Sequence, residues 1–242
     1  MTKYPKRLVR KVLRGVEKID LVMSQFRDAQ RFSEVFPEFS NYRRLKKAHE
    51  QKLMPAYEAY IGGISSEDMA ASMETAVFLF TLAFVKQPSQ ILDLGSGFSS
   101  FVFRLYAKEA GDGVAVFSVD DNQEWLSKTR SFLVACDLET THLLDWRAFS
   151  QSKTGRFDLI FHDLGSMELR AETLPHVLDL SLPEGAIVLD DMHSEYYRPI
   201  ALKIVEESGF SLYSARKYTL DRFGRFSEVA IQGDPRDKLE TG

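Results

Sequence analysis

The chain has 242 residues, of which 44% are hydrophobic and 27% are charged, and its formal net charge is −4. This size suits one domain with a full core, and the acidic balance argues against a general nucleic-acid binder. The single cysteine, Cys136, excludes an internal disulfide and a cysteine-based metal cluster, so we expect a cytoplasmic protein. The longest apolar run, residues 76–85, is shorter than the ~20 residues of a membrane span, and we expect no secretory signal.

We interpret residues 1–64 as a helical N-terminal extension. Residues 6–26 place apolar side chains on one helical stripe, and residues 1–18 carry seven basic residues and one acid, a net charge of +6. Such a helix suits packing on its own domain, a homodimer contact or an anionic membrane surface. The segment 32–60 is rich in aromatic residues, which suit either a lid over a site or the seat of a helical cap on the core.

A second helix is expected after the glycine pair at 62–63. Ser65, with Asp68 three residues later, resembles a helix N-cap followed by an acidic residue in the first turn. The helix should run to about Lys86, because Pro88 disfavours a helical residue before it. Its apolar composition indicates a buried helix.

From residue 90 onward, predicted strands alternate with predicted helices. The strands are expected at about 90–94, 114–119, 141–145, 157–162 and 185–190. The helices are expected at about 98–110, 123–136, 167–180 and 195–208. This alternation predicts an α/β domain with a parallel sheet and helices on both faces. The tail, with SLYSARKYTL and RFSEVAIQG around DRFG, predicts a terminal antiparallel hairpin.

The stretch PSQILDLGSGFSSFVFRLY, residues 88–106, predicts a ligand-binding bend. Gly95 and Gly97 follow a strand, so the backbone can turn tightly and a ligand can approach where no Cβ atom stands in the way. The helix that follows offers free N–H groups. The dinucleotide fingerprint G-x-G-x-x-G has a third glycine where this chain has Ser100. Asp93 would repel a pyrophosphate and favours a ligand with a sulfonium and an amino group.

At this point the chain resembles the class I S-adenosylmethionine-dependent methyltransferases over residues 65–232. The resemblance is carried by ILDLGSG, VFSVDDN, FDLIFHD and GAIVLDDMH, in this order and each at the end of a predicted strand. It implies a Rossmann-like, doubly wound, mostly parallel seven-stranded sheet with a C-terminal antiparallel hairpin. It also implies that residues 65–242 form the methyltransferase domain.

The resemblance implies that the glycine bend holds S-adenosylmethionine. Asp93, Gly95, Ser96 and Gly97 would line the methionine part of this cofactor, and Ser99 would lie near its carboxylate. The alternative for an acid in such a place is a helix cap or a turn.

The same resemblance implies contacts to the rest of the cofactor. Asp120 would accept hydrogen bonds from the ribose hydroxyls, with Asp121 beside it. Asp145 and Trp146 would receive the adenine. Capping remains the alternative for the acids, and a core position remains the alternative for Trp146.

Three carboxylates, Asp163, Asp190 and Asp191, end two strands that are neighbours in the resembled fold. They would repel one another unless they are paired, protonated or bound to a cation. The pattern is similar to metal-dependent small-molecule O-methyltransferases, in which a magnesium-like ion holds the acceptor hydroxyls. The stretch DLGS lacks the histidine that those relatives often have, so base catalysis by His193 without a metal is the competing hypothesis.

The sequence therefore predicts an enzyme that transfers a methyl group from S-adenosylmethionine to a hydroxyl of a small-molecule acceptor. Asp163 and His193 are its candidate catalytic residues, and Mg²⁺ or another divalent cation is a candidate cofactor. Two alternatives remain open. One is a methyltransferase-like binding or scaffold protein without turnover, and the other is an NAD(P)-dependent oxidoreductase.

Overall fold

The computed structural model describes residues 31–111, 113–152 and 155–232. The basic helix expected at 6–26, and with it the expected dimer contact and membrane-surface contact, lies outside these residues. None of the helices within the described ranges combines the length and the apolar character needed to cross a membrane.

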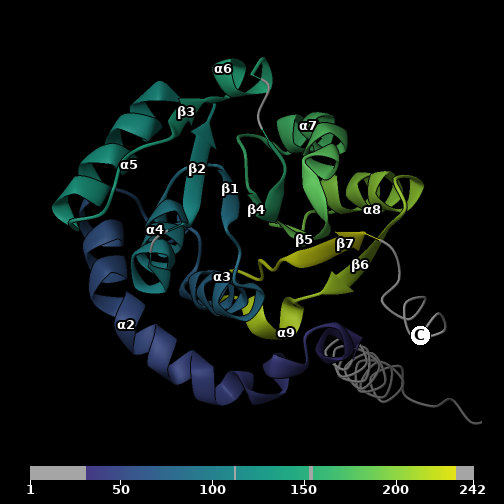
Figure 1. The fold of residues 1–242 in the computed structure, drawn as a ribbon, viewed down its shortest axis with the longest axis horizontal. Coiled ribbons are helices and arrows are strands. Elements are labelled where there is room, and N and C mark those ends of the chain that lie inside the picture. Colours follow the sequence, from purple (N-terminus) through teal and green to yellow (C-terminus); the bar gives the residue numbers. More distant parts are fainter. Residues whose placement is uncertain (1–30, 112, 153–154, 233–242) are drawn as a thin grey trace, which may run out of the picture.

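Within the described residues, seven strands form one sheet in the order β3-β2-β1-β4-β5-β7-β6 (Figure 1). The strands are β1 (Gln90–Leu94), β2 (Ala115–Asp120), β3 (Leu143–Asp145), β4 (Phe157–His162), β5 (Ser181–Leu189), β6 (Phe210–Ser214) and β7 (Glu228–Gln232). The first five pair in parallel, while β7 runs antiparallel to both of its neighbours, β5 and β6. This confirms the predicted doubly wound sheet and its terminal antiparallel hairpin.

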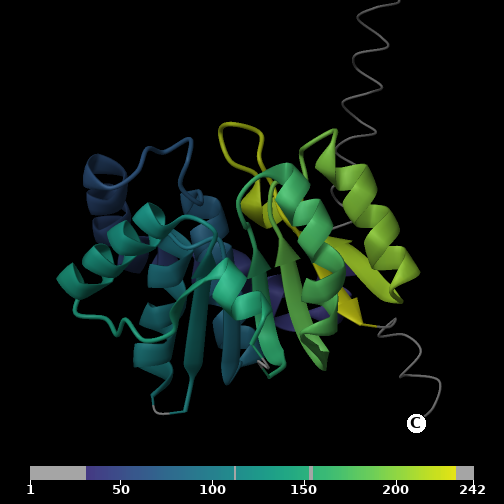
Figure 2. The same ribbon diagram turned by 90° about the horizontal axis from the view of Figure 1, so that it is seen from above.

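Helices cover both faces of the sheet (Figure 2). They are α2 (Tyr42–Gly63), α3 (Met73–Lys86), α4 (Phe98–Ala110), α5 (Gln123–Ala135), α6 (Trp146–Ser150), α7 (Met167–Asp179), α8 (Tyr197–Glu207) and α9 (Arg216–Thr219), with a 3₁₀ turn, η1 (Pro37–Asn41), before α2. Alternate strand residues face opposite sides, so Ile91 packs with α2–α5 and α9, whereas Leu92 packs with α6–α8.

The helix expected from Ser65 is wrong at its start, because α3 begins at Met73. Ser72 is the N-cap, and its hydroxyl accepts a hydrogen bond from the backbone N–H of Thr75 at 3.1 Å. Around Ser65 the chain makes only one turn, in which the N–H of Ala70 donates to the carbonyl of Ser66. Residues 64–72 therefore form a loop, and the buried helix predicted for residues 76–85 begins later than expected.

The aromatic residues of segment 32–60 pack on the core. The Phe32 ring lies 5.8 Å from the Phe78 ring of α3 and 5.2 Å from the Tyr218 ring of α9, measured between centroids. Tyr57, near the other end of the segment, packs edge-on against Phe98 at 5.0 Å. Most of the segment therefore packs on the core, with α2 against α3 and α4, while Tyr60 at its end lines the pocket described below.

Candidate functional site

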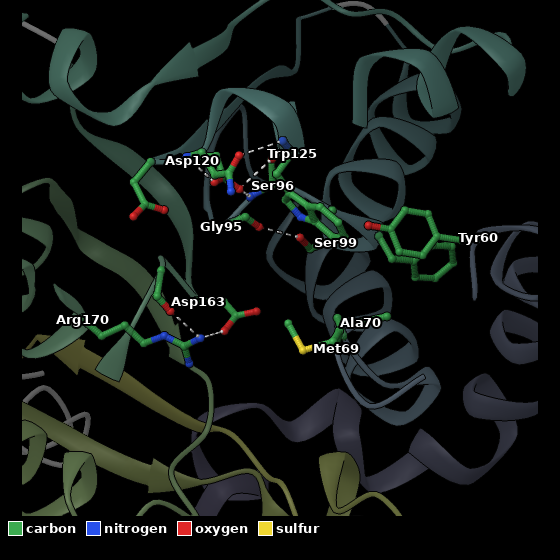
Figure 3. Close-up of a pocket in the computed structure, with 16 residues that line it drawn as sticks. Tyr60, Met69, Ala70, Gly95, Ser96, Ser99, Asp120, Trp125, Asp163 and Arg170 are labelled. Atoms are coloured by element: carbon green, nitrogen blue, oxygen red, sulfur yellow. Dashed lines mark hydrogen bonds and ion pairs between the residues drawn. The ribbon is translucent and has the colours of Figure 1, made fainter. Parts of the chain in front are cut away.

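A pocket of about 290 Å³ opens at the carboxyl end of the sheet, where the strand order reverses between β1 and β4. Ligands of open α/β sheets bind at such a switch point. The bend after β1 is fixed on both sides, because the N–H of Gly95 donates to the carbonyl of Val119 at 2.8 Å and the N–H of Asp163 donates to the carbonyl of Leu94 at 2.7 Å. Figure 3 shows the pocket between this bend, α5 and the 64–72 loop.

Only glycine fits the first position of the bend. Gly95 has a φ of +99°, and a Cβ atom there would stand 2.3 Å from the carbonyl oxygen of Asp163. At the start of α4, a Cβ atom on Gly97 would meet the Tyr60 hydroxyl at 3.1 Å. A side chain at Gly95 would therefore collide with the end of β4, and one at Gly97 would approach the pocket residues Tyr60 and Trp125.

Asp120 lies in the pocket wall and organises the bend. Its carboxylate accepts hydrogen bonds from the N–H and the hydroxyl of Ser96, at 2.7 and 2.8 Å, and from the N–H of Asn122 at 2.9 Å. Burial raises the pKa of Asp120. Asn122 also caps α5, which sets Trp125 in the pocket wall, and Asp121 lines the same wall.

Asp93 lies behind the bend, not in the pocket. It is fully buried and accepts hydrogen bonds from the hydroxyls of Ser100 and Ser118, and Ser118 is in turn bonded to the buried Arg104. Burial raises the pKa of Asp93 to about 6. The predicted contact of Asp93 with a cofactor is therefore replaced by a supporting role, because Asp93 ties the start of α4 to β2.

The two residues predicted at the adenine also lie outside this pocket. The Asp145 carboxylate caps α6, accepting from the N–H groups of Arg147 and Ala148, and accepts from the Gln123 amide at 2.9 Å. Trp146 packs beside Phe149, with ring centroids 6.0 Å apart. For both, the structure matches the alternatives of a helix cap and a core position.

The 64–72 loop closes the pocket from the side opposite β4. Met69, Ala70 and Ala71 line it, and Met69 lies across from Asp163 (Figure 3). Arg225 holds the loop by donating hydrogen bonds to the carbonyl oxygens of Glu67, Asp68 and Ala70, at 3.2, 2.7 and 3.3 Å. Because Asp221 fixes the Arg225 side chain at 2.7 Å, the segment before β7 anchors one wall of the pocket.

The predicted metal ligands surround an arginine. Arg170 of α7 lies 2.5 Å from a carboxylate oxygen of Asp163 and 2.8 Å from one of Asp191, while Asp190 accepts from the Ser227 hydroxyl at 2.7 Å. In the described part of the chain, no three or more His, Cys, Asp and Glu side chains are grouped to hold a metal ion. With a fixed positive charge between them, these carboxylates do not fit a divalent cation.

His193 lies next to this cluster. Its Nδ1 is 3.4 Å from a carboxylate oxygen of Asp191, and about a third of its side chain is exposed. Asp191 has a φ of +53°, a left-handed conformation that is uncommon outside glycine but that Asp adopts more readily than most residues. Arg170 lines the pocket and donates to Asp191, and His193 lies on the other side of Asp191.

No family model matches the chain, and no curated protein sequence does either. Solved structures do match. The SAH-bound methyltransferase PaMTH1 of Podospora anserina aligns with a TM-score of 0.58 and 14% identity, over 81% of this chain and 96% of its own. The SAM-bound O-methyltransferase TomG of Streptomyces achromogenes, from tomaymycin synthesis, gives 0.54 and 18%, over 75% and 89%. The ribosomal protein L11 methylase of Lactobacillus delbrueckii subsp. bulgaricus gives 0.52 and 15%, over 68% and 79%.

The chain has the class I methyltransferase fold. Its antiparallel β7, inserted between β5 and β6, separates this fold from the dinucleotide-binding fold, whose sheet continues in parallel. Several pocket residues were not anticipated from the sequence, among them Tyr60, Met69, Trp125 and Arg170. Trp125, five residues after Asp120 and in the first turn of a capped helix, is the one that a sequence pattern could have indicated.

Proposed function

We propose that this protein is an S-adenosylmethionine-dependent methyltransferase that methylates a hydroxyl of a small molecule. The observation that carries the proposal is the uncovered backbone bend at Gly95 and Gly97, at the sheet's switch point and beside the buried Asp120. The SAM- and SAH-bound structures of the same fold support this choice of cofactor, and TomG supports an oxygen acceptor.

The residues of the pocket fit this cofactor in three ways. The bend leaves room for the methionine part, and the hydroxyl of Ser99 and the first N–H groups of α4 suit its carboxylate. Asp120 suits the ribose hydroxyls, and the flat face of Trp125 suits an apolar ring. When bound, the cofactor supplies a methyl group on a positively charged sulfur, which is already a good leaving group.

On the acceptor side, His193 is our candidate general base, and Asp191 is the carboxylate that orients its ring. The cofactor would supply the methyl group and the leaving sulfur, and His193 would take the proton of an acceptor hydroxyl that extends from the pocket past Arg170. Asp163, at the end of β4 and in the pocket wall, would align the acceptor hydroxyl with the methyl group.

Calorimetric titration with S-adenosylhomocysteine tests the cofactor half. We expect the wild type to bind and Asp120→Ala to lose at least tenfold in affinity, because about two hydrogen bonds to a charged group are removed. Asp145→Ala is the matched control, since it removes a helix-capping carboxylate outside the pocket. Equal losses in both variants, or protection against heating by NAD(P) in place of S-adenosylhomocysteine, would contradict the proposal.

Release of S-adenosylhomocysteine from S-adenosylmethionine in the presence of a metabolite extract tests the catalytic half. We expect turnover that His193→Gln lowers by about 10²-fold or more, the usual contribution of a general base, without a change in cofactor affinity. Tight cofactor binding with no release in any extract would favour the alternative of a binding or scaffold protein.

A further inference from the structure

Arg170 stands where the sequence predicted a divalent cation. It projects from the first turn of α7 toward the ends of β4 and β5, and 8% of its side chain is exposed. Figure 3 shows its guanidinium group beside Asp163 at the edge of the pocket. The cluster is thus formed by three carboxylates and one arginine, which come from three separate elements.

The carboxylate oxygens are directed at this arginine. One terminal nitrogen lies 2.5 Å from Asp163 and also donates to the carbonyl of Gly165 at 3.4 Å, and the other donates to Asp191 at 2.8 Å. Asp190 is turned away to the Ser227 hydroxyl. A magnesium ion requires about six oxygen ligands in near-octahedral geometry. Here one oxygen of each carboxylate already accepts from Arg170 or from Ser227.

The charge of Arg170 is permanent. The guanidinium group stays protonated at every pH that a protein survives, and removing one partner of a buried ion pair is strongly destabilising. A divalent cation would have to displace this buried side chain or approach a like charge at a few ångströms. The geometry therefore favours the arginine over the ion as the partner of Asp163 and Asp191.

We propose that Arg170 is a built-in replacement for the divalent cation on the acceptor side. It neutralises Asp163 and Asp191, holds Asp191 in place to orient His193, and makes the site independent of a metal. That the enzyme works without a metal rests on the function proposed above. That Arg170 fills the place of the cation does not rest on it. The two can therefore fail separately.

Titration with Mn²⁺ alone, followed by electron paramagnetic resonance, tests the occupancy. We expect no saturable binding by the wild type at millimolar Mn²⁺. Arg170→Met keeps most of the side-chain length and removes the charge. It should gain a site that binds Mn²⁺ at least tenfold more tightly than the millimolar limit of the wild type, together with an Mn²⁺-dependent rise in melting temperature. Adding Asp163→Asn to Arg170→Met should abolish the gained site.

The control and the contrary outcomes are equally specific. Arg225→Met removes an arginine that pairs with a single carboxylate, Asp221, and should gain no Mn²⁺ site. Saturable Mn²⁺ binding by the wild type that Asp163→Asn removes would overturn the proposal, and this measurement needs no variant of Arg170. A folded Arg170→Met that gains no site would overturn it as well. S-adenosylhomocysteine titration of the same samples reports on the proposed function independently.

Discussion

Replacing Gly95 with alanine should damage both stability and cofactor binding. The new Cβ atom would lie 2.3 Å from the Asp163 carbonyl oxygen, so the ends of β1 and β4 must move apart. A positive φ costs a residue other than glycine about 1–2 kcal/mol. The movement also weakens the hydrogen bonds from Gly95 to Val119 and from Asp163 to Leu94, which are worth about 1 kcal/mol each. We therefore expect a total loss of about 3–4 kcal/mol in the free energy of unfolding.

Gly111→Ala is a matched control, because Gly111 has a φ of +90° and a Cβ atom there would meet nothing within 4 Å. Gly111→Ala should show the cost of the backbone conformation alone. Gly95→Ala should therefore be about 2 kcal/mol less stable than Gly111→Ala, which lowers its melting temperature by about 4–8 °C more. Urea denaturation measures the difference, and calorimetry should show S-adenosylhomocysteine affinity falling at least tenfold in Gly95→Ala only. Equal destabilisation of the two variants would refute the argument from close approach.

Three further predictions concern the surroundings of the pocket. Burial raises the pKa of Asp93 to about 6. The free energy of unfolding should therefore fall by up to ~3 kcal/mol as the pH rises from about 4 to about 6, because the buried carboxyl must lose its proton. Asp93→Asn should flatten that slope in urea denaturation across the pH series. Arg225→Ala should lower S-adenosylhomocysteine affinity about tenfold in calorimetry, because the 64–72 loop loses three hydrogen bonds. Phe78→Ala should cost about 3–5 kcal/mol in the free energy of unfolding, since it leaves a cavity under segment 32–60.

The first two of these predictions have specific contrary results. An unchanged pH slope in Asp93→Asn would mean that the carboxyl ionises normally despite its burial. Arg225→Ala with wild-type affinity would mean that the loop holds its place without the arginine. Lys52→Ala, which removes an exposed ion pair with Glu109, is the common control and should change none of the three measurements.

The strands, the helices after β1 and the glycine bend were predictable because their signals are local. Apolar runs indicate strands, and the glycine pair directly after the first strand indicates a tight bend, which the structure has at Gly95. The hairpin was also predicted, although its strands are joined through α9 and a long loop. The helix start predicted at Ser65 was wrong because Ser65, like Ser72, has the sequence pattern of a helix N-cap. The contacts of Arg225 with residues 67–70, which are distant in sequence, hold this segment as a loop.

The missed site residues depend on contacts between distant segments. Tyr60 reaches the bend because α2 packs along α3 and α4, and Arg170 reaches Asp163 because α7 crosses beside the ends of β4 and β5. Nothing near Arg170 in the sequence marks it as a partner of carboxylates. Asp93 shows the opposite error, since a strand-end acid looks exposed in sequence, while the serines of α4 and β2 enclose it completely.

Arg225 binds the 64–72 loop through main-chain oxygens alone, and every amino acid supplies the same oxygen. The exposed side chains of Asp68 and Met69 can therefore change without weakening these hydrogen bonds, and Met69 points into the pocket. A set of variants with substitutions at these positions would alter the shape and polarity of the pocket wall formed by the 64–72 loop, while the backbone of the loop kept its position. The protein thus offers a short segment in which substrate preference can be varied, by natural divergence or by an engineer, with little risk to folding.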